Sequence, residues 1–121
     1  MNWNITAGRP VYVQLVEQLE LALVAGEFPP GNRIPPVREL AADAGVNPNT
    51  MQRALAELER TGLVYTQRTA GRFVTEDAAV VDSAKQELAH QQIGAFLHRM
   101  ERMGYDREQT AQLVRSWEED A

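Results

Sequence analysis

The 121-residue sequence predicts a mainly helical protein that carries one small β-hairpin. Apolar residues recur at three- and four-residue steps through most of the chain, which indicates amphipathic helices. Two short alternating stretches, 63–67 and 72–75, are joined by four residues that include a glycine, a pattern typical of a hairpin. An acidic stretch over residues 76–86 then precedes two further helical segments. We therefore expect two parts, residues 1–76 and residues 77–121.

The first helix is predicted between residues 10 and 25. Val11 is followed by a leucine every four residues as far as Leu23, which is helical spacing. Pro10 suits the first turn and Gly26 suits the end. Residues 27–36 contain four prolines and a glycine, so they are expected to form a connection without helix or central strand.

Two helices are predicted to follow this connection. The first begins at the proline pair 35–36 and ends at Gly45. The second is capped by Asn47, has Pro48 in its first turn and ends at Gly62. Its buried face is expected to consist of Met51, Ala54, Leu55 and Leu58.

The spacing within this pair is that of a helix-turn-helix. Two helices that cross near a right angle need a small residue at their closest approach and a glycine in the turn. Ala41 and Gly45 occupy those positions. With the hairpin directly after it, the pair predicts a winged helix-turn-helix, which is a DNA-binding architecture.

In this architecture the second helix enters the major groove with its N-terminal residues toward the base edges. Amides pair with adenine and arginine pairs with guanine or phosphate. The candidate residues are Asn47, Asn49, Thr50, Gln52 and Arg53. Asn47 is also the expected helix cap, and the alternative for Arg53 is an ion pair with Glu57 four residues on.

Further contacts are predicted outside this helix. Arg38, in the first turn of the preceding helix, is placed to bind a backbone phosphate, its alternative being an ion pair with nearby acids. The hairpin tip forms a wing in which Arg68, Gly71 and Arg72 are candidate contacts, although Gly71 would also serve the turn alone.

The net charge of −5 counts against a nucleic-acid partner when taken alone. Its distribution is different, because residues 33–72 contain six arginines and four acidic residues and are therefore at +2. The alternative to DNA binding is a protein-interaction module that uses the winged-helix fold, with the acidic surface facing a basic partner.

The C-terminal part is predicted to be a helical hairpin for dimerisation. Its first helix would be capped by Asp82 or Ser83, and its second opens with Asp106 and Gln109. About 35 residues rarely fold alone, so the apolar stripe needs a partner, and self-association is the simplest one. The predicted dimerisation residues are Ile93, Phe96, Leu97, Met100, Met103, Leu113, Val114 and Trp117.

Residues 10–75 resemble the winged-helix domain of GntR-family transcription regulators, and the short tail resembles the YtrA-like subfamily. The resemblance is carried by PPGNRIPPVRELAADAGVNPNTMQRALAELERTGLV and GRFV. It implies a homodimeric repressor that binds a palindromic operator, often beside transporter genes. It also implies a phosphate contact at Arg38, recognition-helix contacts at the residues given above, a wing contact at Gly71 and a further contact at Arg33. The sequence departs from the family at Pro36, where serine is usual, and in the wing.

Other classes of function are not expected. The chain has no cysteine, no catalytic serine elbow and no phosphate-binding loop, so an enzyme, a cofactor and a thiolate metal site are not predicted. Glu87 and His90 stand at a Glu-x-x-His spacing, but one such motif does not make a di-iron site. No signal peptide or membrane span is predicted, and we expect the cytoplasm and its nucleoid as the location. The tail reveals no effector pocket, so a small-molecule effector stays open.

Overall fold

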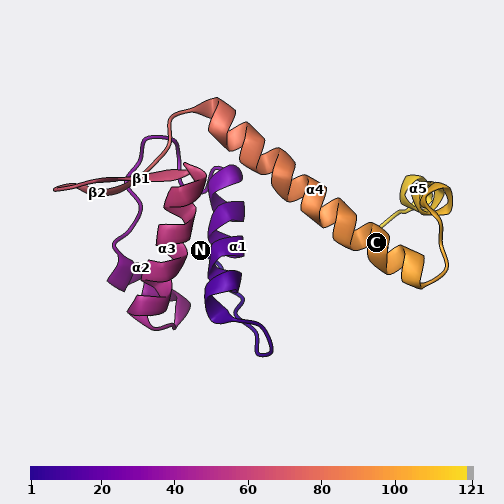
Figure 1. Ribbon diagram of the computed structural model, residues 1–121, viewed down its shortest axis with the longest axis horizontal. Helices are drawn as coiled ribbons and strands as arrows, with labels where there is room; N and C mark the ends of the chain where they lie inside the picture. The colour runs from indigo at the N-terminus through magenta and orange to yellow at the C-terminus, as the bar shows by residue number, and fades with distance from the viewer. Residues whose placement is uncertain (120–121) are drawn as a thin grey trace. The chain divides into compact units, whose positions relative to one another are not determined.

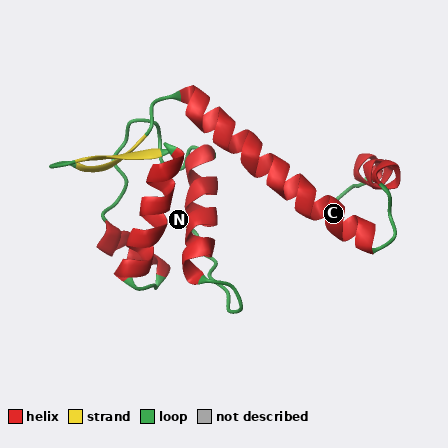
Figure 2. Ribbon diagram, in the orientation of Figure 1, coloured by secondary structure: helices red, strands yellow, loops and turns green. Residues whose placement is uncertain are grey.

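The structure, a computed structural model, describes residues 1–119 and contains five helices and one two-stranded sheet in that range (Figures 1 and 2). Its mainly helical character and its hairpin confirm the predicted fold class. The chain forms two compact units, Met1–Lys85 and a second unit that begins at Gln86. The elements are α1 (Val11–Val24), α2 (Val37–Ala44), α3 (Pro48–Thr61), β1 (Val64–Gln67), β2 (Gly71–Val74), α4 (Ala78–Arg102) and α5 (Arg107–Ser116).

The helix ends of the first unit follow the residues that the sequence offers for them. The Asn47 side chain accepts a hydrogen bond of 2.8 Å from the Asn49 N–H, and Pro48 is the first residue of α3. Gly45 and Gly62 close α2 and α3 with φ of 72° and 83°, in the left-handed region that favours glycine. These predicted ends are confirmed, and the turn between α2 and α3 is short and defined.

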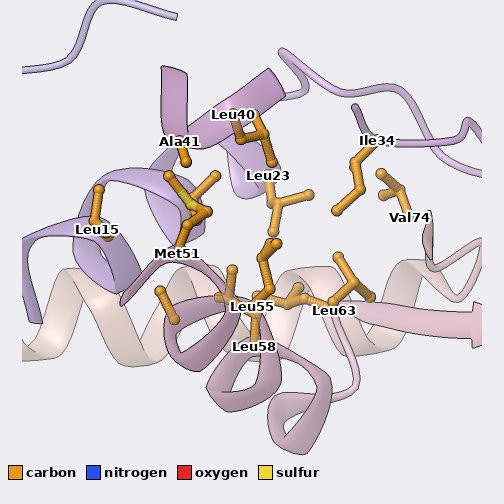
Figure 3. Packing of buried hydrophobic residues seen from close by; sticks show 13 residues of the cluster. Leu15, Leu23, Ile34, Leu40, Ala41, Met51, Leu55, Leu58, Leu63 and Val74 are labelled. Atoms are coloured by element: carbon orange, nitrogen blue, oxygen red, sulfur yellow. The ribbon is translucent and has the colours of Figure 1, made fainter. Parts of the chain in front are cut away.

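The core of the first unit lies where α1, α2 and α3 meet the start of the sheet (Figure 3). The predicted stripe of α3 is fully buried, and Ala41 of α2 is 1% exposed. The buried cluster consists of Leu15, Leu19, Leu23, Ile34, Leu40, Ala41, Met51, Ala54, Leu55, Leu58, Leu63, Val64 and Val74. One face of α3 is thereby fixed in the core, and its opposite face remains exposed.

The wing is an antiparallel hairpin whose register runs from Val64 opposite Val74 to Gln67 opposite Gly71. Residues 68–70 form the loop, and Gly71 has φ of 107°, a conformation that side chains rarely tolerate. The hairpin follows α3 directly. The length of α3 and the turn at Gly62 therefore fix where the wing starts.

The proline-rich connection lies along the free edge of β2. The Gly31 N–H donates to the Val74 carbonyl at 2.9 Å, and the Ile34 N–H donates to the Arg72 carbonyl at 3.0 Å. Prolines are tolerated at a sheet edge because their missing N–H faces away from the ladder. The connection was predicted to contain no central strand. This agrees with the structure, in which the segment pairs only with the edge of the sheet.

Residues 1–9 lie against the helices through side-chain amides, which the sequence did not indicate. The amide group of Gln14, which is 3% exposed, accepts from the Thr6 N–H and donates to the Thr6 carbonyl, both at 2.8 Å. The Trp3 indole N–H donates to the Asp43 carboxylate at 2.8 Å. This N-terminal segment therefore joins α1 to α2.

The start of α4 differs from the prediction. The helix begins at Ala78, and the Asp77 carboxylate accepts a hydrogen bond of 3.0 Å from the Ala79 N–H. The predicted cap at Asp82 or Ser83 is wrong, because both residues lie inside this helix. Several acidic and serine residues in this stretch offer the same capping chemistry, and only tertiary contacts select among them.

Those contacts come from Val80, Val81 and Ala84, which pack against the core of the first unit. Their burial is gained only if the helix has started before them. The helix then continues without a break to Arg102, so the second unit begins within α4 rather than after a linker. The change of composition over residues 76–86 therefore does not mark a linker. It marks the part of the chain where α4 leaves the core of the first unit and becomes more exposed to solvent.

Within the second unit, α5 has the predicted capping box. The Asp106 carboxylate accepts from the Gln109 N–H at 2.8 Å, and the Gln109 side chain accepts from the Asp106 N–H at 2.9 Å. Gly104, with φ of 97°, closes the preceding turn. Thr110 is 2% exposed. The apolar stripe is otherwise open: Ile93, Phe96, Met103, Leu113, Val114 and Trp117 are exposed, and Leu97 and Met100 are half-buried.

Candidate nucleic-acid interface

The first turns of α3 present the polar residues that the sequence singled out. Asn49, Gln52 and Arg53 are exposed, and Thr50 is half-buried. These positions lie on the side of α3 opposite its buried stripe. Asn47 is exposed too, but its side-chain oxygen serves the helix cap. Amide and guanidinium groups therefore stand on the one face of α3 that a groove could receive.

Arg38 stands free in the first turn of α2. Its side chain is exposed, and no hydrogen bond or ion pair engages it within residues 1–119. The alternative ion pair with neighbouring acids is therefore not formed. A free guanidinium beside the N-terminal amides of a helix is well suited to bind an anion.

Arg53 has an aromatic partner that the sequence did not reveal. Its guanidinium carbon lies 3.6 Å from the centre of the Tyr12 ring, which comes from the first turn of α1. The alternative ion pair with Glu57 is not formed, because Glu57 accepts instead from Arg60 at 3.3 Å. The Tyr12 ring thus holds the Arg53 guanidinium in place, while the arginine remains exposed to solvent.

Arg72 joins the wing to α3. Its Nε donates to Glu59 Oε1 at 2.7 Å, and the Thr66 hydroxyl donates to the same oxygen. The Arg72 side chain is only 17% exposed. The Thr66 hydrogen bond, together with the hydrogen bond and charge of Arg72, lowers the pKa of Glu59, although partial burial acts in the opposite direction. Arg72 therefore braces the wing.

The lowered pKa of Glu59 makes this brace pH-dependent. Because the folded-state pKa lies below the ordinary value of about 4.5, the stabilisation is complete above that pH and is lost as pH falls through the folded pKa. We expect Glu59→Gln to be less stable than the wild type at pH 7, by less than about 1 kcal/mol, because solvent still screens a pair that is only partly buried. Urea unfolding of both proteins from pH 7 to pH 3 checks this. A difference that stays constant over that range would contradict it.

Arg33 lies over the glycine of the wing. A Cβ atom built on Gly71 would stand 2.8 Å from Arg33 Nε, so any larger residue there would displace the guanidinium. Arg33 also bridges to Phe73 as an edge residue of the sheet. A shallow cavity of about 270 Å³ brings together Arg33, Thr66, Gly71, Arg72 and the segment Ile34–Val37 at the start of α2.

Arg68 lies exposed at the wing tip, as predicted from its place in the loop. Every residue predicted to contact DNA therefore lies in the first unit: on α2, on α3 and its cap, on the wing and, for Arg33, in the connection before α2. Sequence reasoning missed Tyr12 and Glu59, the two residues that orient arginines of this site. Their partners are remote in the sequence, and no local spacing signals such pairs.

Two other features are absent from residues 1–119. No three His, Asp or Glu side chains gather there as a set of metal ligands, and Glu87 and His90 are exposed. None of the helices in that range combines the length and the apolar character that crossing a lipid bilayer requires.

Known proteins are similar to this chain in both sequence and fold. The sequence profile of the bacterial regulatory proteins of the gntR family matches residues 11–74, from α1 to the end of β2. The uncharacterized HTH-type transcriptional regulator YhcF of Bacillus subtilis is 35% identical over 119 residues, which is 98% of each protein. The HTH-type transcriptional repressor YtrA of the same organism is 41% identical over 69 residues, 57% of this chain and 53% of YtrA.

Two solved structures extend the comparison. A GntR family transcriptional regulator from Listeria monocytogenes is similar with a TM-score of 0.85 and 34% identity, over 93% of this chain and 99% of that one. The DNA-binding domain of AraR in complex with operator ORE1 is similar with a TM-score of 0.53 and 27% identity, over 62% of this chain and 94% of that one. The chain belongs to the GntR family of bacterial regulatory proteins and is a DNA-binding transcriptional regulator with YhcF and YtrA among its homologues, not an enzyme.

Proposed function

We propose that the protein is a homodimeric repressor that binds a palindromic operator. The observation that carries the proposal is the set of unpaired polar groups on α2 and α3: Arg38 is free, and Asn49 and Gln52 are exposed beside it in the helix-turn-helix. A regulator that reads a defined sequence needs both groups that bind phosphate and groups that read bases. Both kinds are available here without rearrangement of the core.

We assign the base edges to α3 and the backbone to its neighbours. Asn49 and Gln52 carry amides that match adenine, Arg53 matches guanine or phosphate, and Thr50 contacts either. Asn47 contributes to this turn mainly as its cap. Arg38, Arg33 and Arg68 bind phosphate, and Gly71 lets the wing approach the DNA closely. Arg72 acts indirectly, since its guanidinium is engaged by Glu59.

The second unit supports the dimer. Apolar side chains of α4, of α5 and of the residue directly after α5 border a groove of about 400 Å³, which is lined by Phe96, Met100, Leu113, Val114 and Trp117. Such a surface is costly to leave in water, and a second copy of the same hairpin offers a matching apolar face. Two recognition helices held together would read half-sites about one helical turn apart, which gives the operator its palindrome.

Repression follows from the place of binding rather than from any chemistry. A dimer seated on an operator within a promoter would exclude RNA polymerase. The relative YtrA is a transcriptional repressor, which supports repression here. The resemblance to its subfamily supports a target beside transporter genes. Both inferences are tested by mapping the selected operator onto the genome and measuring transcription with and without the protein.

The experiment that tests DNA binding is a selection of random duplexes on the purified protein, followed by titration of the selected site at several salt concentrations. We expect Arg38→Ala to weaken binding to all sequences by roughly tenfold or more and to reduce the salt slope by about 1. Asn49→Ala should instead relax the preference at defined positions, at about 1–3 kcal/mol per lost bidentate contact.

Arg60→Ala is the matched control, because it removes the same charge from the last turn of α3, where Arg60 is exposed and pairs with Glu57. Its affinity should stay close to that of the wild type. Failure to enrich any duplex would overturn DNA recognition and favour the protein-interaction module. Normal binding by both Arg38→Ala and Asn49→Ala would refute the contact assignment alone.

A further inference from the structure

The aromatic contact of Arg53 has a consequence for how this protein binds DNA. Arg53 belongs to α3, and Tyr12 belongs to the first turn of α1. A separation of 3.6 Å between the guanidinium carbon and the ring centre means that the guanidinium lies on the face of the ring. This distance is well inside the limit of about 6 Å for an attractive cation–π contact.

The contact occurs next to the residues proposed to read DNA. Arg53 follows Asn49 by four residues, so the two side chains are neighbours on the same exposed face of α3. Tyr12 is half-buried, and α1 packs against α3 in the core through Leu15 and Leu19. The ring is therefore anchored by a rigid element, whereas the arginine it holds remains exposed.

Stacking occupies the flat face of a guanidinium and leaves its N–H donors at the edge. All five donors of Arg53 therefore remain available to a guanine edge or a phosphate. An unrestrained surface arginine would lose much of its rotamer freedom on binding, which costs free energy. An arginine that the free protein already restrains loses less.

We propose that Tyr12 is a positioning residue for DNA recognition, which holds the guanidinium of Arg53 at the reading face of α3 before DNA binds. The inference rests on the proposed function, since it requires Arg53 to contact the operator. It adds a residue outside the helix-turn-helix to the determinants of affinity. Tyr12 itself need not touch DNA.

The test is a double-mutant cycle on the selected operator, with the whole 121-residue chain. Tyr12→Leu should weaken binding about two- to fivefold, the equivalent of one exposed cation–π contact. Tyr12→Phe keeps the ring and should bind like the wild type. Arg53→Ala should weaken binding more strongly, and adding Tyr12→Leu to Arg53→Ala should cause no further loss.

Thermal unfolding of each variant separates positioning from folding. If Tyr12→Leu unfolds at the assay temperature, Tyr12→Gln removes the ring with a residue that favours helices and takes its place in the cycle. Equal losses from Tyr12→Leu with and without Arg53 would overturn the inference, because the tyrosine would then act independently.

The cycle also distinguishes a failure of this inference from a failure of the proposed repressor function on which it rests. Suppose that Arg53→Ala binds the operator normally, while Arg38→Ala and Asn49→Ala bind weakly. This result would overturn the role of Tyr12 but would not affect the proposed repressor function. If neither Asn49→Ala nor Arg53→Ala changed the sequence preference, the proposed reading face itself would be refuted.

Discussion

Phe96→Asp is expected to convert the proposed dimer to a monomer and to reduce operator affinity by about a hundred- to ten-thousandfold. Phe96 is 36% exposed on α4 and borders the apolar groove of the second unit, far along the chain from every proposed DNA contact. The loss arises because a monomer binds one half-site, and the second half-site no longer gains from effective concentration. The contacts of each reading face stay the same.

The physical basis is the cost of burying a carboxylate in an apolar interface. A charged group without a partner disfavours the associated state strongly, whereas it is well solvated on a free surface. Trp117, at 71% exposed, is the largest side chain beside the groove, so Trp117→Asp should act in the same direction. The two variants test one surface from α4 and from the residue that follows α5.

Sedimentation measures the oligomeric state, and titration of the selected operator measures the affinity. Gln91→Asp is the matched control: it adds the same charge to α4, but Gln91 lies five residues before Phe96, about 140° around the helix. It should remain a dimer. A dimer of Phe96→Asp with full affinity would refute this groove as the dimer interface.

Much of the first unit was predictable because its signals are local. Asn47 with Pro48 marks a helix start, and Gly45 and Gly62 mark ends, since each acts on its own backbone. The leucine spacing of α1 and α3 identified the faces that became the core. Because one face of α3 was predicted to be buried, the remaining face was predicted to be exposed. That face carries Asn49 and Gln52, the candidate residues for reading bases.

What escaped prediction depends on pairs that are distant in sequence. The bond between Trp3 and Asp43 and the stacking of Arg53 on Tyr12 each join elements that only the folded core brings together. Arg72 illustrates the consequence: its contact with DNA stays a prediction, whereas its ion pair with Glu59, which braces the wing, was not predicted from the sequence. Charge alone does not tell a free arginine from a paired one.

The start of α4 was predicted wrongly for a related reason. Residues 76–86 contain several groups able to cap a helix, so a cap at Asp82 or Ser83 and a cap at Asp77 look equally good locally. Burial of Val80 and Val81 against the first unit decides between them. A valine pair in a polar stretch was the sole sequence sign of that contact.

The last prediction concerns the residue that holds the reading helix in place. Leu55 is 0% exposed in the middle of α3 and packs in the core cluster with residues of α1, α2 and the sheet (Figure 3). Leu55→Ala is expected to lower the unfolding free energy by about 2–5 kcal/mol, through lost apolar burial and the cavity that remains. This is a large share of the about 5–15 kcal/mol that stabilises a typical domain.

Urea unfolding at one fixed protein concentration measures the effect, because association also contributes to the stability of a dimer. Gln52→Ala, three residues earlier on the exposed side of α3, is the control and should change stability by no more than about 0.5 kcal/mol. The two variants should behave oppositely toward DNA: folded Leu55→Ala keeps the operator preference, whereas Gln52→Ala relaxes it at defined bases. A loss below about 1 kcal/mol for Leu55→Ala would mean that the helices close around the gap. The core would then hold α3 less rigidly than the burial of Leu55 indicates.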